Sequence, residues 1–201
     1  MKTTSVKELS IQISLNGLSF CIINKGTNEV EFLKTESFNS KQTPQNLLEK
    51  LKTVLETNSV FEQTFENVIC IYQNELSCLV PSKYFSENNL ADYLKFNAKI
   101  LKTDFISHDK VESVDAYNVY VPLININNYI FETFGTFTYK HSSTILIENL
   151  SHFNVSESDR ILVNINDTSF EFLCFKDSQL HLCNTFQFHT PEDFIYYLLF
   201  T

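Results

Sequence analysis

The chain of 201 residues lacks the basic clusters that bind nucleic acids or anionic membranes. It has no run of Lys or Arg, and 24 acidic side chains against 15 basic ones give a net charge of −9. Phosphate groups are bound by clustered cations, so this balance argues against both kinds of surface. No apolar segment approaches the ~18 residues of a membrane span, and the N-terminal residues show no apolar core of a signal peptide. We therefore expect a cytoplasmic protein that binds neither nucleic acid nor membrane.

Patterns that hold metals or form disulfide frameworks are also missing. The five cysteines include no Cys-x-x-Cys pair, and their odd number argues against a closed set of disulfides. Each lies in an apolar, strand-like run, which predicts reduced and buried thiols. Strand alternation places Cys183 on the side that points away from the core. Its spacing from His181 and His189 matches no zinc pattern, so we expect no metal site.

No residue stands out as catalytic. His141 precedes Ser142, but two neighbours in sequence do not make a nucleophile and its base. Ser142 is better interpreted as the cap of a helix over residues 142–152.

What is present is a clear strand pattern near the N-terminus. The residues from Leu9 to Leu15 alternate between apolar and polar, which predicts a half-buried strand. Asn16-Gly17 predicts a tight hairpin turn with both residues at positive φ, followed by strands over 18–23 and 30–38. Thr43 and Pro44 then predict the start of a helix with one apolar stripe.

The same order of elements recurs near the C-terminus. Strands are predicted over 161–165, 168–173 and 180–188, with turns at Asn166-Asp167 and at 176–179. Thr190-Pro191 then opens a helix, 147 positions after Thr43-Pro44. We interpret the two stretches as an internal duplication; two unrelated meanders are the alternative.

The segment between the copies alternates strands and helices. The run Val68–Ile71 is apolar throughout and predicts a parallel strand buried on both faces. Further predictions are strands over 76–80, within 102–123 and over 136–139, and helices over 86–97, through 126–134 up to Gly135, and over 142–152.

Three groups of residues carry a resemblance to known proteins. They are Leu9–Ile23, residues 118–122 running into 125–128, and residues 134–137 with 141–144. On these, the chain resembles a family of uncharacterised bacterial proteins with an actin-like ATPase fold, in which two ribonuclease-H-like units follow one another. The resemblance implies an α/β fold, with a ribonuclease-H-like mixed sheet, flanking helices and an incomplete second lobe.

The resemblance also implies a division of the chain. Residues 1–158 would form the first lobe, with an inserted subdomain at about 82–140, and residues 159–201 would begin the second. A complete second lobe needs on the order of 100 residues more, so we expect a fragment. The apolar segment 194–200 is accordingly expected to be a helix buried between layers.

In the actin-like superfamily, two hairpin turns bind phosphates through backbone N–H groups, and an Asp beside each turn holds Mg²⁺. The resemblance places Ser14 and Asn164 at the positions of those acids, and it leaves the second turn without glycine. Only three glycines occur in the chain, so a glycine pair for adenosine is missing as well. A ribonuclease-H-type nuclease is disfavoured, because the strand from Leu9 to Leu15 supplies no carboxylate for two metal ions.

These features predict a non-catalytic scaffold or protein-interaction module that binds a protein partner and has no cofactor. The alternative is a weak or atypical ATPase that binds ATP with Mg²⁺. Under that alternative the binding residues are Asn16, Gly17, Asn166 and Asp167.

Overall fold

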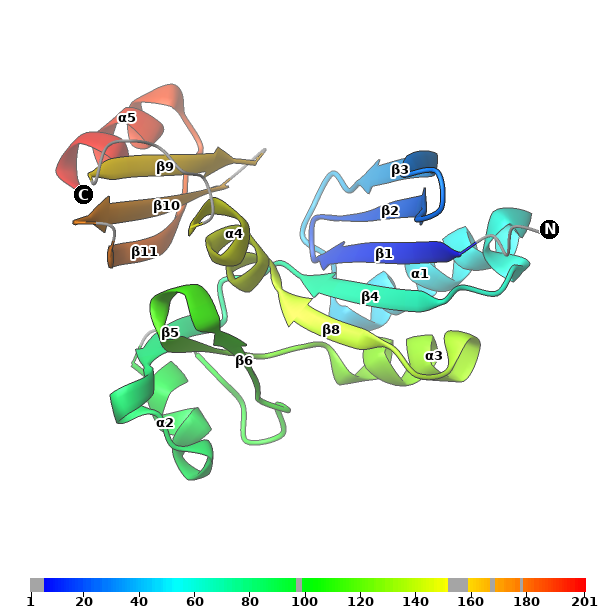
Figure 1. Cartoon of the computed structure of the whole chain (residues 1–201), viewed down its shortest axis with the longest axis horizontal. Helices are drawn as coiled ribbons and strands as arrows, with labels where there is room; N and C mark the ends of the chain where they lie inside the picture. Colours follow the sequence, from blue (N-terminus) through cyan, green and yellow to red (C-terminus); the bar gives the residue numbers. More distant parts are fainter. Residues whose placement is uncertain (1–5, 97–98, 152–158, 167–168, 178) are drawn as a thin grey trace.

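The computed structural model describes residues 6–96, 99–151, 159–166, 169–177 and 179–201, within which the strands form three sheets (Figure 1). The first sheet contains β1 (Lys7–Ser14), β2 (Gly17–Asn24), β3 (Glu29–Ser37), β4 (Asn67–Tyr72) and β8 (Thr138–His141). The second contains β5 (Ser77–Pro81), β6 (Ser107–Val111) and β7 (Ala116–Tyr120), and the third contains β9 (Arg160–Ile165), β10 (Ser169–Lys176) and β11 (Gln179–Gln187). The helices are α1 (Pro44–Thr57), α2 (Leu90–Leu94), α3 (Ile124–Phe134), α4 (Ser142–Ser151) and α5 (Pro191–Phe200). Four short 3-10 helices are η1 (Ser59–Glu62), η2 (Ser82–Tyr84), η3 (Glu87–Asn89) and η4 (Glu112–Val114).

The first sheet is mixed and has the strand order β3-β2-β1-β4-β8. Its first three strands form the predicted antiparallel meander. β4 then pairs in parallel with β1, and β8 pairs in parallel with β4. The predicted α/β fold with a mixed sheet and flanking helices is therefore confirmed.

Helices α1 and α3 pack on one face of this sheet (Figure 1) and create its core. Alternate residues of β1 are fully buried there, and so is the whole apolar stripe of α1. The helix α1 begins as expected, with the Thr43 side chain accepting the Asn46 N–H at 3.2 Å and Pro44 as its first residue. Because the helices cover one face only, Ile69 and Ile71 of β4 are half-buried, and the expectation of a strand buried on both faces is wrong.

The second sheet has the order β5-β7-β6 and is antiparallel. The helix expected over 86–97 is much shorter: it consists of η3 and the five residues of α2. The pair Asn88-Asn89 explains the late start, because asparagine is a weak helix former in a helix interior. The assignment of residues 82–140 to an insert, and of 1–158 and 159–201 to two lobes, stays a prediction.

The third sheet has the order β11-β10-β9, and α5 packs against it by one face. Phe194 lies 4.9 Å from Phe170 between ring centroids, and the Thr190–Asp193 capping box starts the helix. The other face of α5 is exposed, with Leu199 at 74% and Phe200 at 77%. Within the described structure three strands offer this helix a single surface, and its burial between layers in a complete lobe stays a prediction. The element order of the first sheet is repeated here, and its origin by duplication stays a prediction.

Cys183 corrects another expectation, because it packs against the core that β10 shares with β6 and α4. Cys183 does alternate with Leu182, but both faces of the sheet are covered: Cys183 lies opposite the buried Leu173, and α5 packs on the other face. A β-bulge at His181 places Leu180 on the same face as Cys183. Burial raises the pKa of the Cys183 thiol to about 12. No disulfide links the five cysteines, of which Cys70 is buried and the others are half-buried. No helix in the described ranges is long and apolar enough to span a membrane.

Candidate functional site

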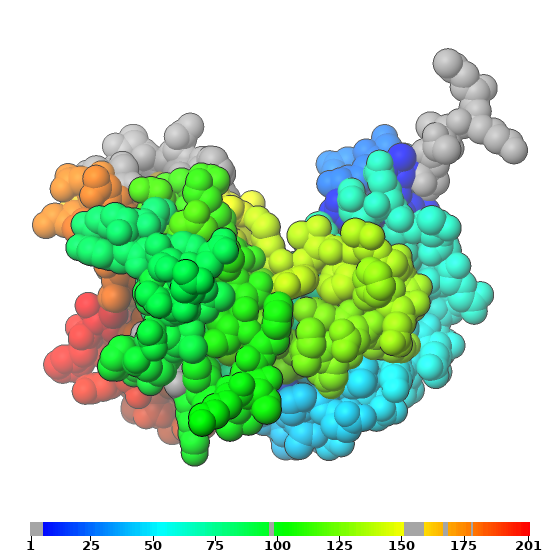
Figure 2. Space-filling view, turned by 90° about the horizontal axis from the view of Figure 1, so that it is seen from below, coloured from blue at the N-terminus to red at the C-terminus, as the bar shows by residue number. Residues whose placement is uncertain are grey.

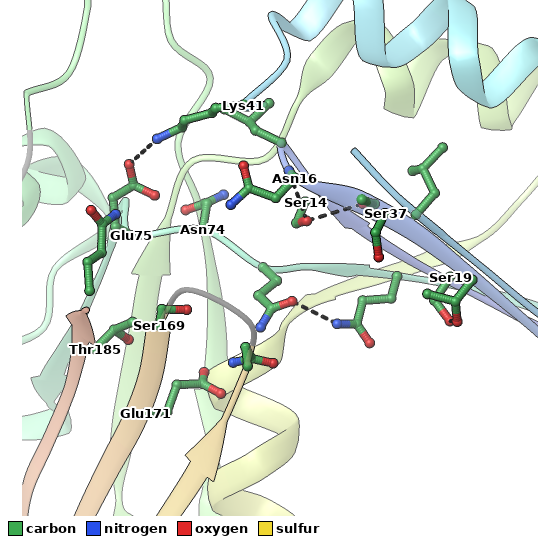
Figure 3. A pocket seen from close by; sticks show the side chains of 18 of the residues that line it. Ser14, Asn16, Ser19, Ser37, Lys41, Asn74, Glu75, Ser169, Glu171 and Thr185 are labelled. Carbon is green, nitrogen blue, oxygen red and sulfur yellow. Dashed lines mark hydrogen bonds and ion pairs between the residues drawn. The ribbon is translucent and has the colours of Figure 1, made fainter. Parts of the chain in front are cut away.

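A cleft of about 570 Å³ lies between the β1–β2 hairpin and the end of the β9–β10 hairpin. Figure 3 shows side chains from both hairpins around it, with Ser14 and Asn16 on one wall and Ser169 and Glu171 on the other. In Figure 2 the yellow segment, which includes β8 and α4, lies at the indentation between the two halves of the molecule. Of the four residues named by the nucleotide hypothesis, Asn16, Gly17 and Asn166 line the cleft, and Asp167 lies outside the described residues.

The first hairpin turn differs from the expected geometry. Ser14 pairs with Gly17, so the two turn residues are Leu15 and Asn16, and no residue of this turn has a positive φ. The Ser14 hydroxyl accepts the Asn16 N–H and donates to the Gly17 carbonyl, both at 3.2 Å. Gly17 is required for a different reason: a Cβ built on it would lie 2.7 Å from the backbone oxygen of Glu36 on β3. Close packing of neighbouring strands therefore explains this glycine.

Replacing Gly17 with alanine should lower the free energy of unfolding by about 1–3 kcal/mol, because a backbone oxygen must move to admit the methyl group. Urea unfolding followed by circular dichroism measures this. Gly26→Ala is the matched control: its Cβ would meet only the flexible end of the Asn24 side chain, at 3.2 Å, and the expected change is within about 0.5 kcal/mol. Equal effects of the two substitutions would contradict our explanation of Gly17.

The second hairpin brings Asn166 to the cleft. Ile165 pairs with Phe170, and the Asn166 N–H donates to the Ser169 carbonyl at 2.8 Å. Asn166 thus holds the position next to the turn that Ser14 holds in the first hairpin, two residues beyond the expected Asn164. Its side-chain nitrogen Nδ2 is buried and has no hydrogen-bond partner among the described residues.

The charges of the cleft are three glutamates against one lysine. Lys41 forms an ion pair with Glu75 at 2.6 Å (Figure 3). Partial burial is the largest single influence on Glu75 and opposes its ionisation, but the hydrogen bond from Lys41, a backbone N–H and the charge of Lys41 together outweigh it, and the pKa of this carboxyl is lowered. Glu36 pairs with Lys34 at 3.0 Å. The third, Glu171, is only 4% exposed.

Glu171 is held by neutral donors. Its Oε1 accepts from the hydroxyls of Ser142 (3.4 Å) and Ser143 (3.0 Å), and its Oε2 accepts from the Asn164 amide (2.8 Å). The two serines begin α4, so the positive end of the helix dipole faces this carboxylate. Within the described ranges Glu171 has no cationic partner.

Lys41, Glu75 and Glu171 were not predicted as site residues from the sequence. One feature of the sequence could have identified Glu171 as a site residue: it interrupts the apolar residues of β10. Lys41 and Glu75 lie in loops 34 residues apart, and no pattern in the sequence connects them.

His141 and Ser142 have structural roles in a buried polar group beneath the cleft. The ring nitrogen Nδ1 of His141 accepts the Ser143 N–H, so Nε2 carries the proton and donates to the Asn74 carbonyl at 3.1 Å. His141, rather than Ser142, therefore caps α4, and the prediction for Ser142 is wrong. Asp109 accepts the His141 N–H and the hydroxyls of Thr144 and Tyr120. No three His, Cys, Asp or Glu side chains gather as metal ligands in the part of the chain that the structure describes.

Two solved structures define the class of fold. A Bacteroides thetaiotaomicron VPI-5482 protein with an actin-like ATPase fold and unknown function superposes with a TM-score of 0.86 at 21% identity, over 98% of this chain and 76% of its own. A chain of the PilM–PilN type IV pilus biogenesis complex gives 0.58 at 12% identity, over 96% of this chain and 64% of its own. The protein therefore has an actin-like fold, as the resemblance implied.

The family follows from the sequence itself. The family model described as protein of unknown function DUF3822 matches residues 1–201, so the chain belongs to the DUF3822 family. No curated protein matches it.

Proposed function

We propose that this protein is a non-catalytic actin-like scaffold that works through protein contacts in the cytoplasm. The observation that carries the proposal is the charge balance of the described cleft lining: its one lysine, Lys41, is already bound to Glu75, and Glu171 is a carboxylate held by the neutral donors Ser142, Ser143 and Asn164. A nucleoside triphosphate is strongly anionic, and the described lining offers it one paired lysine beside three carboxylates. Five cysteines without a disulfide agree with a reducing compartment. A chain of similar fold in the PilM–PilN complex supports a role in assemblies.

A second candidate function is an atypical ATPase. The cleft volume of about 570 Å³ supports it, because small-molecule sites measure roughly 300–1,000 Å³. Asn16, Gly17, Asn166 and Asp167 would then bind phosphate and Mg²⁺ from the two turns.

A thermal shift experiment separates the two candidates. We expect the melting temperature of the whole chain to stay unchanged in millimolar Mg-ATP. A nucleotide at 100 times its Kd would add about 2.7 kcal/mol, which at roughly 2–4 °C per kcal/mol raises the melting temperature by several degrees.

AMP serves as the control ligand, because it lacks the β- and γ-phosphates of ATP. A rise with Mg-ATP that AMP does not reproduce, and that Asp167→Ala abolishes, would overturn the scaffold proposal.

A further inference from the structure

The lining of the cleft has the chemistry of a site for a polar but not anionic ligand. Amide and hydroxyl side chains form most of it, and no Phe or Tyr ring is among the described residues that line it. Nucleobases and sugars are commonly bound by stacking on such rings. The lining suits a ligand that is recognised by hydrogen bonds and charge.

The charged side chains of the lining favour a cationic ligand. The described lining holds Glu36, Glu75 and Glu171 against one lysine, Lys41, and one histidine, His189. Lys41 binds Glu75 and Lys34 binds Glu36, so Glu171 is the glutamate without an ion pair among the described residues. Glu171 is the deepest of the three, and hydroxyl and amide donors surround it without an ion-pair partner among the described residues. A carboxylate has about four acceptor positions, and Glu171 uses three. One position remains for a cationic N–H donor.

One buried donor in the wall also lacks a partner. Asn166 Nδ2 has no acceptor in the described structure, although buried polar atoms are nearly always paired. A peptide carbonyl supplies that acceptor, and the same peptide can carry the cation that Glu171 lacks.

We propose that the cleft between the β1–β2 and β9–β10 hairpins binds an extended peptide segment of a partner protein through a Lys or Arg side chain. The basic group meets Glu171, and the backbone carbonyl of the segment accepts the Asn166 amide. The proposal rests on the scaffold function above and names the contact by which it acts. The net charge of −9 favours the approach of a basic partner.

The test uses the whole chain and four pools of fluorescent heptapeptides, each with Arg, Lys, Gln or Glu fixed at the centre and all other positions randomised without charged residues. Fluorescence anisotropy at low salt should show binding of the Arg or Lys pool and none of the Gln and Glu pools. Glu171→Gln should weaken this binding about tenfold or more, because the partner cation loses its buried counter-charge.

Glu132→Gln is the matched control. It removes one exposed carboxylate on α3, outside the cleft, and should leave the affinity unchanged. If Glu171→Gln does not unfold cooperatively, Glu75→Gln in the same lining replaces it, with an expected loss of at least threefold.

Each result of these binding experiments either supports or contradicts the proposed peptide site. No binding by the Arg and Lys pools, equal binding by the Gln pool, or unchanged affinity in Glu171→Gln would overturn it. If Mg-ATP also leaves the melting temperature unchanged, the scaffold function survives without this contact. Stabilisation by Mg-ATP, in contrast, removes the scaffold function and the peptide site together.

Discussion

Replacing Phe20 with alanine is expected to lower the free energy of unfolding by about 3–5 kcal/mol. Phe20 on β2 is fully buried, and its ring lies 5.3 Å from that of Phe61 between centroids. The substitution removes apolar surface from the core and leaves a cavity that the strand and helix α1 can fill only in part. Urea unfolding at pH 7, followed by circular dichroism, measures the loss.

Leu33→Ala on β3 is the matched control for this core position. Leu33 is 69% exposed, so its truncation should change the free energy of unfolding by less than about 0.5 kcal/mol. Similar losses for the two variants would mean that the apolar face of the hairpin is not the one covered by the helices.

Acid is expected to destabilise the protein through His141. Burial lowers the pKa of this imidazole from 6.5 to about 4, because the charged form would lose its hydration. Between these values the unfolded chain binds a proton that the folded chain does not. The stabilisation is therefore complete above pH 6.5 and is lost as the pH falls towards 4, by about 3 kcal/mol in all.

A comparison of variants isolates this contribution. Unfolding of the wild type and of His141→Asn is measured at pH 7 and pH 4, and the difference between the two proteins should shrink by about 3 kcal/mol at the lower pH. Glu75, whose pKa is lowered, and Asp109, whose pKa is raised by burial, titrate in both proteins and largely cancel.

The exposed His181 on β11 provides the control position, and His181→Asn should keep the pH dependence of the wild type. A parallel pH dependence in the wild type and His141→Asn would contradict the assignment of a buried, neutral His141.

Local patterns were sufficient to predict most of the elements. The two-residue period from Leu9 to Leu15 reflects a strand with one face under α1, and the Thr43-Pro44 start of that helix needs only its own backbone. Residue patterns gave wrong predictions of burial where the packing of a neighbouring element determines it. The sheet of β9–β11 is covered on both faces, so Cys183 lies against a core, whereas α1 and α3 pack on one face of the first sheet and leave Ile69 and Ile71 half-buried.

The candidate site was predictable in outline only. The resemblance pointed to the two hairpin turns, and Asn16 and Asn166 do line one cleft. The reason for Gly17 was missed, because the oxygen that crowds it belongs to Glu36, on another strand. Glu171 could not be recognised as a buried carboxylate, since its donors Ser142 and Ser143 come from a helix almost 30 positions earlier.

The amino-acid sequence by itself determined the order of strands and helices, the acidic charge and the absence of basic clusters, because these depend on neighbours along the chain. The tertiary structure alone decided which charges meet in the cleft, which face of β11 is buried and why Gly17 must be glycine. The reason is physical: a side chain's partners and burial depend on how the sheets and helices pack, and residues far apart in sequence provide them.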